Sequence, residues 1–174
     1  MAKKIFSKPD WIAKLGVDDI YSVSGCMSEY FADYVNYWKH NGYWLFDSPG
    51  VINKLAEEHT LDLTETKFFY YEVYDLQFTE NQHAWQTFTP ETSFKTNVVV
   101  PEKKHLEGYD IVSFSAGTSP ECSPLSCNSL ARDIKVNGHC LLNSLEDARQ
   151  SLKSGKFKNS EPGPYRVFAV YSFE

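Results

Sequence analysis

The hydrophobic positions in the first part of the chain recur every three or four residues, as they do in an amphipathic helix. This spacing predicts a helix over residues 27–40, with its apolar side chains on one face: Phe31, Tyr34, Val35 and Trp38. A shorter helix is predicted over residues 10–15, because Asp10 can cap its N-terminus and Gly16 can end it.

A third helix is predicted to begin after Ser48. Serine is a preferred N-cap, and a proline such as Pro49 fits the first helical position. The residues expected to face inward are Ile52, Leu55 and Ala56. Residues 1–62 are therefore expected to form a mostly helical part of the chain.

After residue 62 the pattern changes to runs rich in aromatic and β-branched residues, which are typical of strands. Strands are predicted over residues 68–78, 93–100, 109–115 and 165–173. The last of these runs is apolar on both faces, as expected of a central strand that is covered on both sides.

Two further helices are predicted between the third and fourth strands. The first is expected to open at Ser126 and Cys127. In the second, Ser144 and Asp147 resemble a capping box, Gly155 ends the helix, and three residues share a face: Leu145, Ala148 and Leu152.

These elements predict an α+β fold in which N-terminal helices precede a mostly antiparallel sheet of about four or more strands, with two further helices packed on it. Residues 1–174 are expected to form a single domain. Its helical part is residues 1–62, and its sheet-containing part is residues 63–174.

Composition adds that aromatic residues make up 16% of the chain, so some of them are expected to line a pocket or an interface. The formal net charge is −6 and the Lys and Arg residues are dispersed, which argues against nucleic-acid binding and allows a basic partner. No apolar run is long enough to span a membrane, and the N-terminus lacks a signal-peptide pattern. Together with free cysteines, these features predict a cytoplasmic protein.

The cysteine-rich segment over residues 119–140 suggests a reactive thiol. If Cys127 lies at the start of a helix, the helix dipole and the unpaired backbone N–H groups there favour a thiolate. His139 could act as its base, and Asn128 or Glu121 could orient that histidine. The other interpretation is that Cys127 is a small buried hydrophobe, which is common for free cysteine.

The same segment allows a zinc-site hypothesis with four soft ligands: Cys122, Cys127, His139 and Cys140. The spacing argues against this site, because no Cys-x2-Cys pair is present and adjacent His and Cys ligands are awkward. Reversible oxidation of Cys122 and Cys127 is a further possibility. No metal and no cofactor are therefore expected.

Glu72 is the other candidate for catalysis. The even-numbered side chains of the strand over residues 68–78 share one face, and Glu72 is the charged residue among them. A carboxylate in an aromatic pocket is a common acid/base arrangement. Alternatively, its face is half open to solvent, or Glu72 forms an ion pair with a nearby cation: Arg166, Arg132 or Lys95.

Aromatic side chains also supply a candidate binding surface, although such clusters more often belong to a core. The candidate ligand-binding residues are Trp38, Tyr43, Trp44, Tyr70, Tyr74 and Arg166. The sequence lacks GxGxxG, GxxxxGK[ST], HExxH and GxSxG motifs.

The leading hypothesis is therefore a ligand-binding, protein-binding or accessory protein, whose partner is an unidentified small molecule or protein. The first alternative is a cysteine-dependent enzyme or redox protein that uses Cys127 with His139, and with Glu72 assisting. The second alternative is a small zinc site within residues 122–140.

Overall fold

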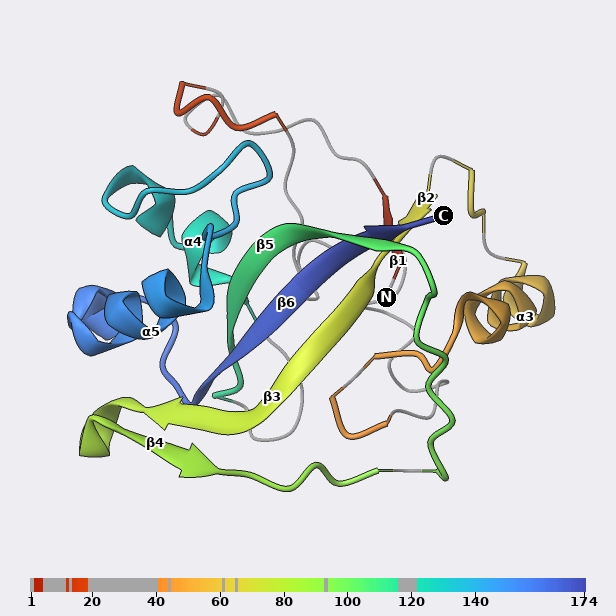
Figure 1. Ribbon diagram of the computed structural model, residues 1–174, viewed down its shortest axis with the longest axis horizontal. Coiled ribbons are helices and arrows are strands. Elements are labelled where there is room, and N and C mark those ends of the chain that lie inside the picture. The colour runs from red at the N-terminus through yellow and green to blue at the C-terminus, as the bar shows by residue number, and fades with distance from the viewer. Residues whose placement is uncertain are drawn as a thin grey trace.

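The computed structural model describes residues 2–4, 12, 14–18, 41–43, 45–60, 62–64, 66–92, 94–115 and 122–174. At its centre lies a twisted antiparallel sheet of four strands in the order β4-β3-β6-β5 (Figure 1). These strands are β3 (Tyr70–Thr79), β4 (Ala84–Thr87), β5 (Lys104–Ser113) and β6 (Tyr165–Phe173). A second, two-stranded antiparallel sheet pairs β1 (Ala2–Lys4) with β2 (Thr66–Phe68).

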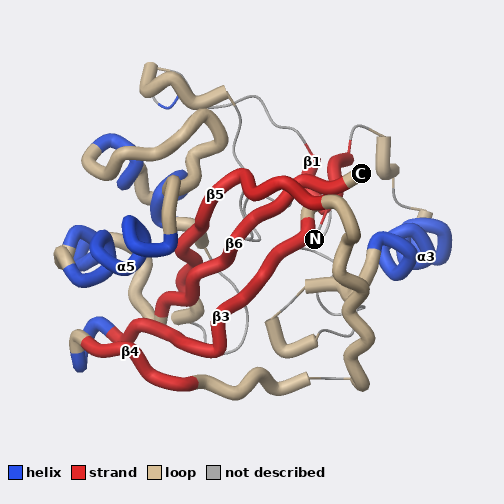
Figure 2. Tube along the Cα trace, in the orientation of Figure 1, coloured by secondary structure: helices blue, strands red, loops and turns tan. Residues whose placement is uncertain are grey.

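Helices flank the four-stranded sheet. In the described part of the chain they are α3 (Pro49–His59), α4 (Pro124–Cys127) and α5 (Leu145–Lys153), with the short 3-10 helices η2 (Glu80–Gln82), η3 (Leu130–Arg132) and η4 (Lys156–Asn159). Figure 2 shows α5 at one flank of the sheet and α3 at the opposite flank. The predicted α+β class is confirmed.

Strand β6 contributes to two hydrophobic cores on opposite faces of the sheet. Tyr165 and Val167 belong to the larger core, which includes Ala148 and Leu152 of α5. Phe168 and Val170 belong to the second core, together with Leu45, Val112 and Phe114. The prediction that the last strand is central and covered on both faces is therefore confirmed.

Two helices begin where their capping residues predict. Helix α3 starts after Ser48 with Pro49 in its first turn, and its buried residues are Ile52, Leu55 and Ala56. At the start of α5, the side chain of Ser144 accepts a hydrogen bond of 3.0 Å from the backbone N–H of Asp147. This is the capping interaction that the sequence predicts.

The strand predicted over residues 93–100 is wrong. Residues 94–100 form no strand, and Val98, Val99 and Val100 are exposed. The backbone N–H groups of Asn97 and Val99 bond to Asp47 instead of to a neighbouring strand. The remaining strand of the sheet is β4, which η2 connects to β3.

Other boundaries differ as well. The run over residues 68–78 divides at Phe69 into β2 and β3, and the strand predicted from Tyr109 already begins at Lys104. The helix predicted to open at Ser126 is instead the one-turn α4, which ends at Cys127. The physical reason is Pro124, which favours the first turn of a helix and so starts it earlier.

The helix predicted over residues 27–40 lies outside the described residues, and the helix predicted over residues 10–15 lies largely outside them. Ile12, which is described, is buried in the larger core. Among the described residues, no helix is both long and apolar enough to cross a membrane.

Candidate functional site

A cavity of about 630 Å³ lies beside β3, where this strand faces the start of α3 and residues 98–101. Its volume falls within the range of small-molecule sites, about 300–1,000 Å³. Eight of the residues that line it are aromatic: Tyr43, Phe46, Phe68, Phe69, Tyr70, Tyr71, Tyr74 and Phe173. The cavity is therefore an aromatic pocket of the kind that the composition predicts.

Asp47 joins two walls of this cavity. Its Oδ1 accepts a hydrogen bond of 3.3 Å from the Asn41 amide, and its Oδ2 accepts one from the backbone N–H of Asn97. Its backbone oxygen accepts a hydrogen bond of 3.4 Å from the N–H of Val99. Because Asp47 directly precedes the N-cap Ser48, the turn that starts α3 also anchors the loop that leads to β5.

The wall carries three carboxylates, and its described residues include no Lys, Arg or His: the carboxylates are those of Asp47, Glu72 and Glu174. The hydrogen-bond donors to the Asp47 carboxylate are neutral groups. Glu174 lies 3.6 Å from the Lys103 ammonium, but both side chains are exposed, which makes this ion pair weak. The cavity thus combines aromatic rings with an excess of negative charge.

Glu72 lies where the cavity wall meets the sheet, and its carboxylate is paired. Lys104 forms an ion pair with Oε1, and the Tyr171 hydroxyl donates a hydrogen bond of 2.9 Å to Oε2. Partial burial acts to raise the pKa of Glu72, but the hydrogen bonds from Lys104 and Tyr171 and the charge of Lys104 outweigh it, and the pKa is lowered. The partner is therefore none of the cations expected from the sequence: Arg166, Arg132 or Lys95.

The Lys104 ammonium also lies over two aromatic rings. It is 4.7 Å from the centre of the Tyr70 ring and 4.3 Å from the centre of the Tyr171 ring, within the range of cation–π interactions. Tyr70 and Glu72 also line the cavity. The Lys104 ammonium is thus bound by two aromatic rings and the Glu72 carboxylate. Because the pKa of Glu72 is lowered, this carboxylate is better suited to binding a cation than to donating a proton.

Arg166 lies on the face of β6 that belongs to the second core. Its guanidinium stacks between two rings, 3.7 Å from the centre of Phe88 and 3.9 Å from that of Phe114. No described residue forms a hydrogen bond with its Nε or Nη1, and burial lowers its pKa to about 10 while Tyr43 acts to raise it. Arg166 is not part of the described cavity wall, but Tyr43 beside it is.

Cys127 lies at the wrong end of its helix for an activated thiolate. It is exposed and is the last residue of α4, whereas the helix dipole favours a thiolate at the N-terminal end. The hypothesis that Cys127 opens a helix is therefore wrong. It is not a buried hydrophobe either, because its side chain is exposed.

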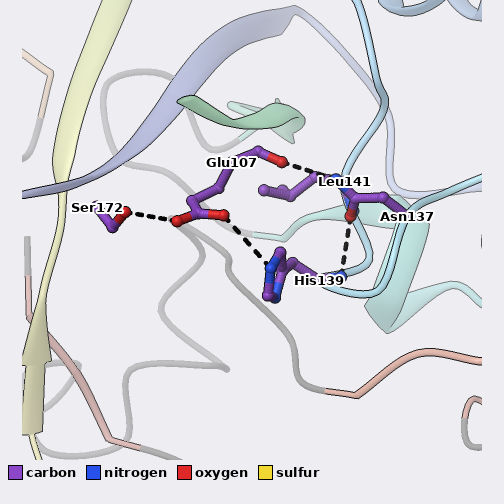
Figure 3. A network of polar contacts seen from close by, with 5 residues as sticks. All are labelled: Glu107, Asn137, His139, Leu141 and Ser172. Carbon is purple, nitrogen blue, oxygen red and sulfur yellow. Dashed lines mark hydrogen bonds and ion pairs between the residues drawn. The ribbon is translucent and has the colours of Figure 1, made fainter. Parts of the chain in front are cut away.

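His139 is paired with Glu107, as Figure 3 shows. Its Nε2 lies 3.4 Å from the Glu107 Oε2, and the Ser172 hydroxyl donates a hydrogen bond of 2.5 Å to Oε1. In a Ser-His-Asp triad the histidine lies between nucleophile and carboxylate. Here the carboxylate lies between serine and histidine, so this order does not activate Ser172.

Asn137 gives this network a structural role. Its amide donates a hydrogen bond of 2.7 Å to the backbone oxygen of Glu107, and its side-chain oxygen accepts bonds from the backbone N–H groups of His139 and Leu141 (Figure 3). The network therefore fastens the loop over residues 137–141 to β5.

A metal site finds no support in the described part of the chain, where no three His, Cys, Asp or Glu side chains are grouped so that they could hold an ion. All four proposed zinc ligands belong to that part. Cys122 and Cys140 are buried, which places both thiols inside the fold rather than in an open loop.

The cavity brings together four of the residues that sequence reasoning selects, namely Glu72, Tyr43, Tyr70 and Tyr74. Trp38 and Trp44 lie outside the described residues. Sequence reasoning missed other parts of the wall: Phe46, Asp47, Ile52 and Val99. In the sequence, Asp47 could have been recognised by its position directly before the predicted helix start at Ser48 and Pro49. In the structure, separate segments of the chain meet at this position.

Comparison with known proteins gives no match: no family model, no curated protein and no solved structure is significantly similar to the chain.

Proposed function

We propose that this protein binds a small organic cation with an aromatic or apolar body in the cavity beside β3. The observation that carries the proposal is a cavity of about 630 Å³ whose wall combines aromatic rings with the carboxylates of Asp47, Glu72 and Glu174. Rings bury the apolar body of a ligand and attract a cation through their faces, and carboxylates select positive over negative charge.

The contacts of Lys104 support this choice of ligand. Its ammonium is bound by the rings of Tyr70 and Tyr171 and by the carboxylate of Glu72, next to the cavity. The residues that line the cavity include the same kinds of groups, namely aromatic residues and carboxylates. Asp47 is the main carboxylate that could balance the charge of the ligand, because the groups that donate hydrogen bonds to it are neutral.

The cysteine-dependent enzyme has less support. It needs a thiolate favoured by its surroundings, and Cys127 lies at the end of α4 where the helix dipole is negative. We also propose a cytoplasmic location, which is the compartment that the sequence predicts. The net charge of −6 supports a cationic ligand or partner over nucleic acid.

Isothermal titration calorimetry with three related indoles tests the proposal. Tryptamine is a cation, tryptophol is neutral and indoleacetate is an anion, so the series changes charge on one aromatic body. We expect tryptamine to bind about tenfold tighter than tryptophol, which corresponds to about 1.4 kcal/mol, and indoleacetate to bind weakest. Equal affinity for the three, or no binding of any at millimolar concentration, would overturn the proposal.

Two neighbouring valines provide matched variants. Val99 is 63% exposed and lines the cavity, whereas Val100 is 56% exposed and is not among the lining residues. Val99→Arg puts a positive charge at the cavity and should weaken tryptamine binding about tenfold, whereas Val100→Arg should change it less than about twofold. The same loss in both variants would mean that tryptamine responds to surface charge in general and does not occupy the cavity.

A further inference from the structure

Residues 96–100 have the sequence of a strand but belong to no sheet in the described part of the chain. The segment reads Thr-Asn-Val-Val-Val, and its three valines are β-branched residues that favour strands. Their side chains are exposed to 47% at Val98, 63% at Val99 and 56% at Val100. Three consecutive exposed valines form an apolar surface that folding of this chain leaves uncovered.

The backbone of this segment is anchored along one edge. The N–H groups of Asn97 and Val99 both bond to Asp47. Asn97 and Val99 are two residues apart, which is the spacing at which an extended chain directs backbone groups to the same side, and on that spacing we infer that the groups of Val98 and Val100 face the other side. No described residue forms a backbone hydrogen bond with Val98 or Val100. The segment therefore presents an edge of the kind that accepts another strand.

This edge lies at the cavity. Val98, Val99 and Pro101 line the cavity. Asp47, which accepts hydrogen bonds from this segment, lines it as well. We propose that residues 96–100 pair with an extended segment of a basic partner protein, and that a Lys or Arg side chain of this segment enters the cavity. The inference rests on the proposed function, because it takes the bound cation to be such a side chain.

The negative charge of the protein and its exposed valines together favour a basic partner with an extended segment. The described cavity wall has three carboxylates and no basic residue, and the whole chain has a net charge of −6, so a basic partner is attracted. A free small cation in the cavity would contact Val98 and Val99, but it would leave Val100 exposed and the backbone groups of Val98 and Val100 without a partner strand. An added strand would cover them and supply hydrogen-bond partners for Val98 and Val100.

Peptides with methylated backbones test the pairing. The probe is the acetylated and amidated pentapeptide Thr-Val-Lys-Val-Thr, titrated by calorimetry beside two versions that carry N-methyl groups on alternate residues. A paired peptide strand donates hydrogen bonds to residues 96–100 only from the N–H groups of one set of alternate residues. The version that is methylated on this set should therefore bind at least about tenfold more weakly, and the version methylated on the other set should keep its affinity. Equal binding of both versions would overturn the strand pairing.

Variants at Val100 separate the edge from the cavity. Val100→Pro removes the N–H that points outward, whereas Val100→Thr keeps it and preserves the branched side chain. We expect the proline variant to bind the pentapeptide about tenfold more weakly than the threonine variant, with the same tryptamine affinity in both. Equal peptide binding by the two variants would overturn the pairing.

Tryptamine shows which of the two proposals fails. If it binds both variants while the pentapeptide does not bind the unchanged protein, the strand inference fails and the proposed function stands. If neither probe binds the unchanged protein, both fail. Retained tryptamine binding also shows that the proline variant is folded.

Discussion

The ammonium of Lys104 forms an ion pair with the carboxylate of Glu72 at the border of the cavity. Lys104→Met should therefore have two effects. It should lower the free energy of unfolding by about 0.5 kcal/mol at neutral pH, a small value because both side chains are partly exposed. It should also strengthen tryptamine binding, because it leaves the Glu72 carboxylate without its internal cation. Urea unfolding and calorimetry measure the two effects, and weaker tryptamine binding would contradict the account.

The control for this change is its neighbour. Lys103 pairs with Glu174 on the surface, and both side chains are more than four-fifths exposed. Lys103→Met should therefore leave stability nearly unchanged. If both methionine variants lose the same stability, the loss reflects the general charge of the segment rather than the pair with Glu72.

The Glu72 pair also predicts a pH dependence. The pKa of Glu72 is lowered from its ordinary value of 4.5 in the folded state, so ionised Glu72 stabilises the fold. This contribution is fully present above about pH 4.5 and is lost as the pH falls through the lowered value. The stability difference between the original protein and Lys104→Met should shrink over that range in urea unfolding experiments. A difference that stays constant down to low pH would contradict the assignment.

Arg166 is 6% exposed, and its Nε and Nη1 atoms form no hydrogen bond with a described residue. Replacing it with Met, which keeps contacts with Phe88 and Phe114, should leave the free energy of unfolding unchanged or raise it by about 1 kcal/mol. Arg166→Lys should be less stable than Arg166→Met, because the ammonium stays buried and loses the planar stacking. A Met variant less stable by several kcal/mol would show that the guanidinium makes stabilising polar contacts. Urea unfolding measures all three proteins.

Gly108 allows a sharp test of the packing around β5. It has a φ of +148°, and a Cβ atom would lie 2.7 Å from both the Leu141 Cβ and the Leu142 oxygen. Gly108→Ala should therefore lower the free energy of unfolding by more than about 2 kcal/mol. Gly155 has a φ of +72° with nothing within 4 Å, so Gly155→Ala should lower it by only about 1 kcal/mol. If both variants lose the same free energy of unfolding, the close contacts with Leu141 and Leu142 do not contribute to the cost of Gly108→Ala.

Cys127 tests the enzyme alternative. Its thiol is exposed while Cys122 and Cys140 are buried, so iodoacetamide should modify Cys127 well before these two in the folded protein. Mass spectrometry of digested protein measures the order of labelling. Cys127→Ser should leave tryptamine affinity unchanged. Labelling of Cys127 at pH 6 much faster than that of glutathione would favour the cysteine-dependent enzyme instead.

The elements that sequence reasoning predicts correctly have local causes. Helix α3 follows from Ser48 and Pro49, and helix α5 follows from the hydrogen bond between Ser144 and Asp147. Strand β6 follows from an apolar run that is typical of a strand covered on both faces. Each of these signals lies within a few residues of the element that it predicts.

The incorrect predictions involve contacts between distant segments. Val98 and Val100 have strand propensity whether or not a partner strand is present, and propensity alone does not reveal that Asp47 takes up the neighbouring N–H groups. Likewise, Lys104 reaches Glu72 because β5 and β3 lie on the two sides of β6. The cavity wall combines residues that are far apart in the sequence, such as Asp47, Glu72, Val99 and Phe173, so its existence follows from the fold and not from a motif.

The central claim is that the cavity beside β3 holds an aromatic cation, and a crystal structure with tryptamine tests it most directly. The account predicts the indole ring against the aromatic wall, with the ammonium within about 4 Å of a carboxylate oxygen of Asp47 or Glu72. Tryptamine bound outside this cavity, or a cavity that stays empty at saturating tryptamine, would contradict it.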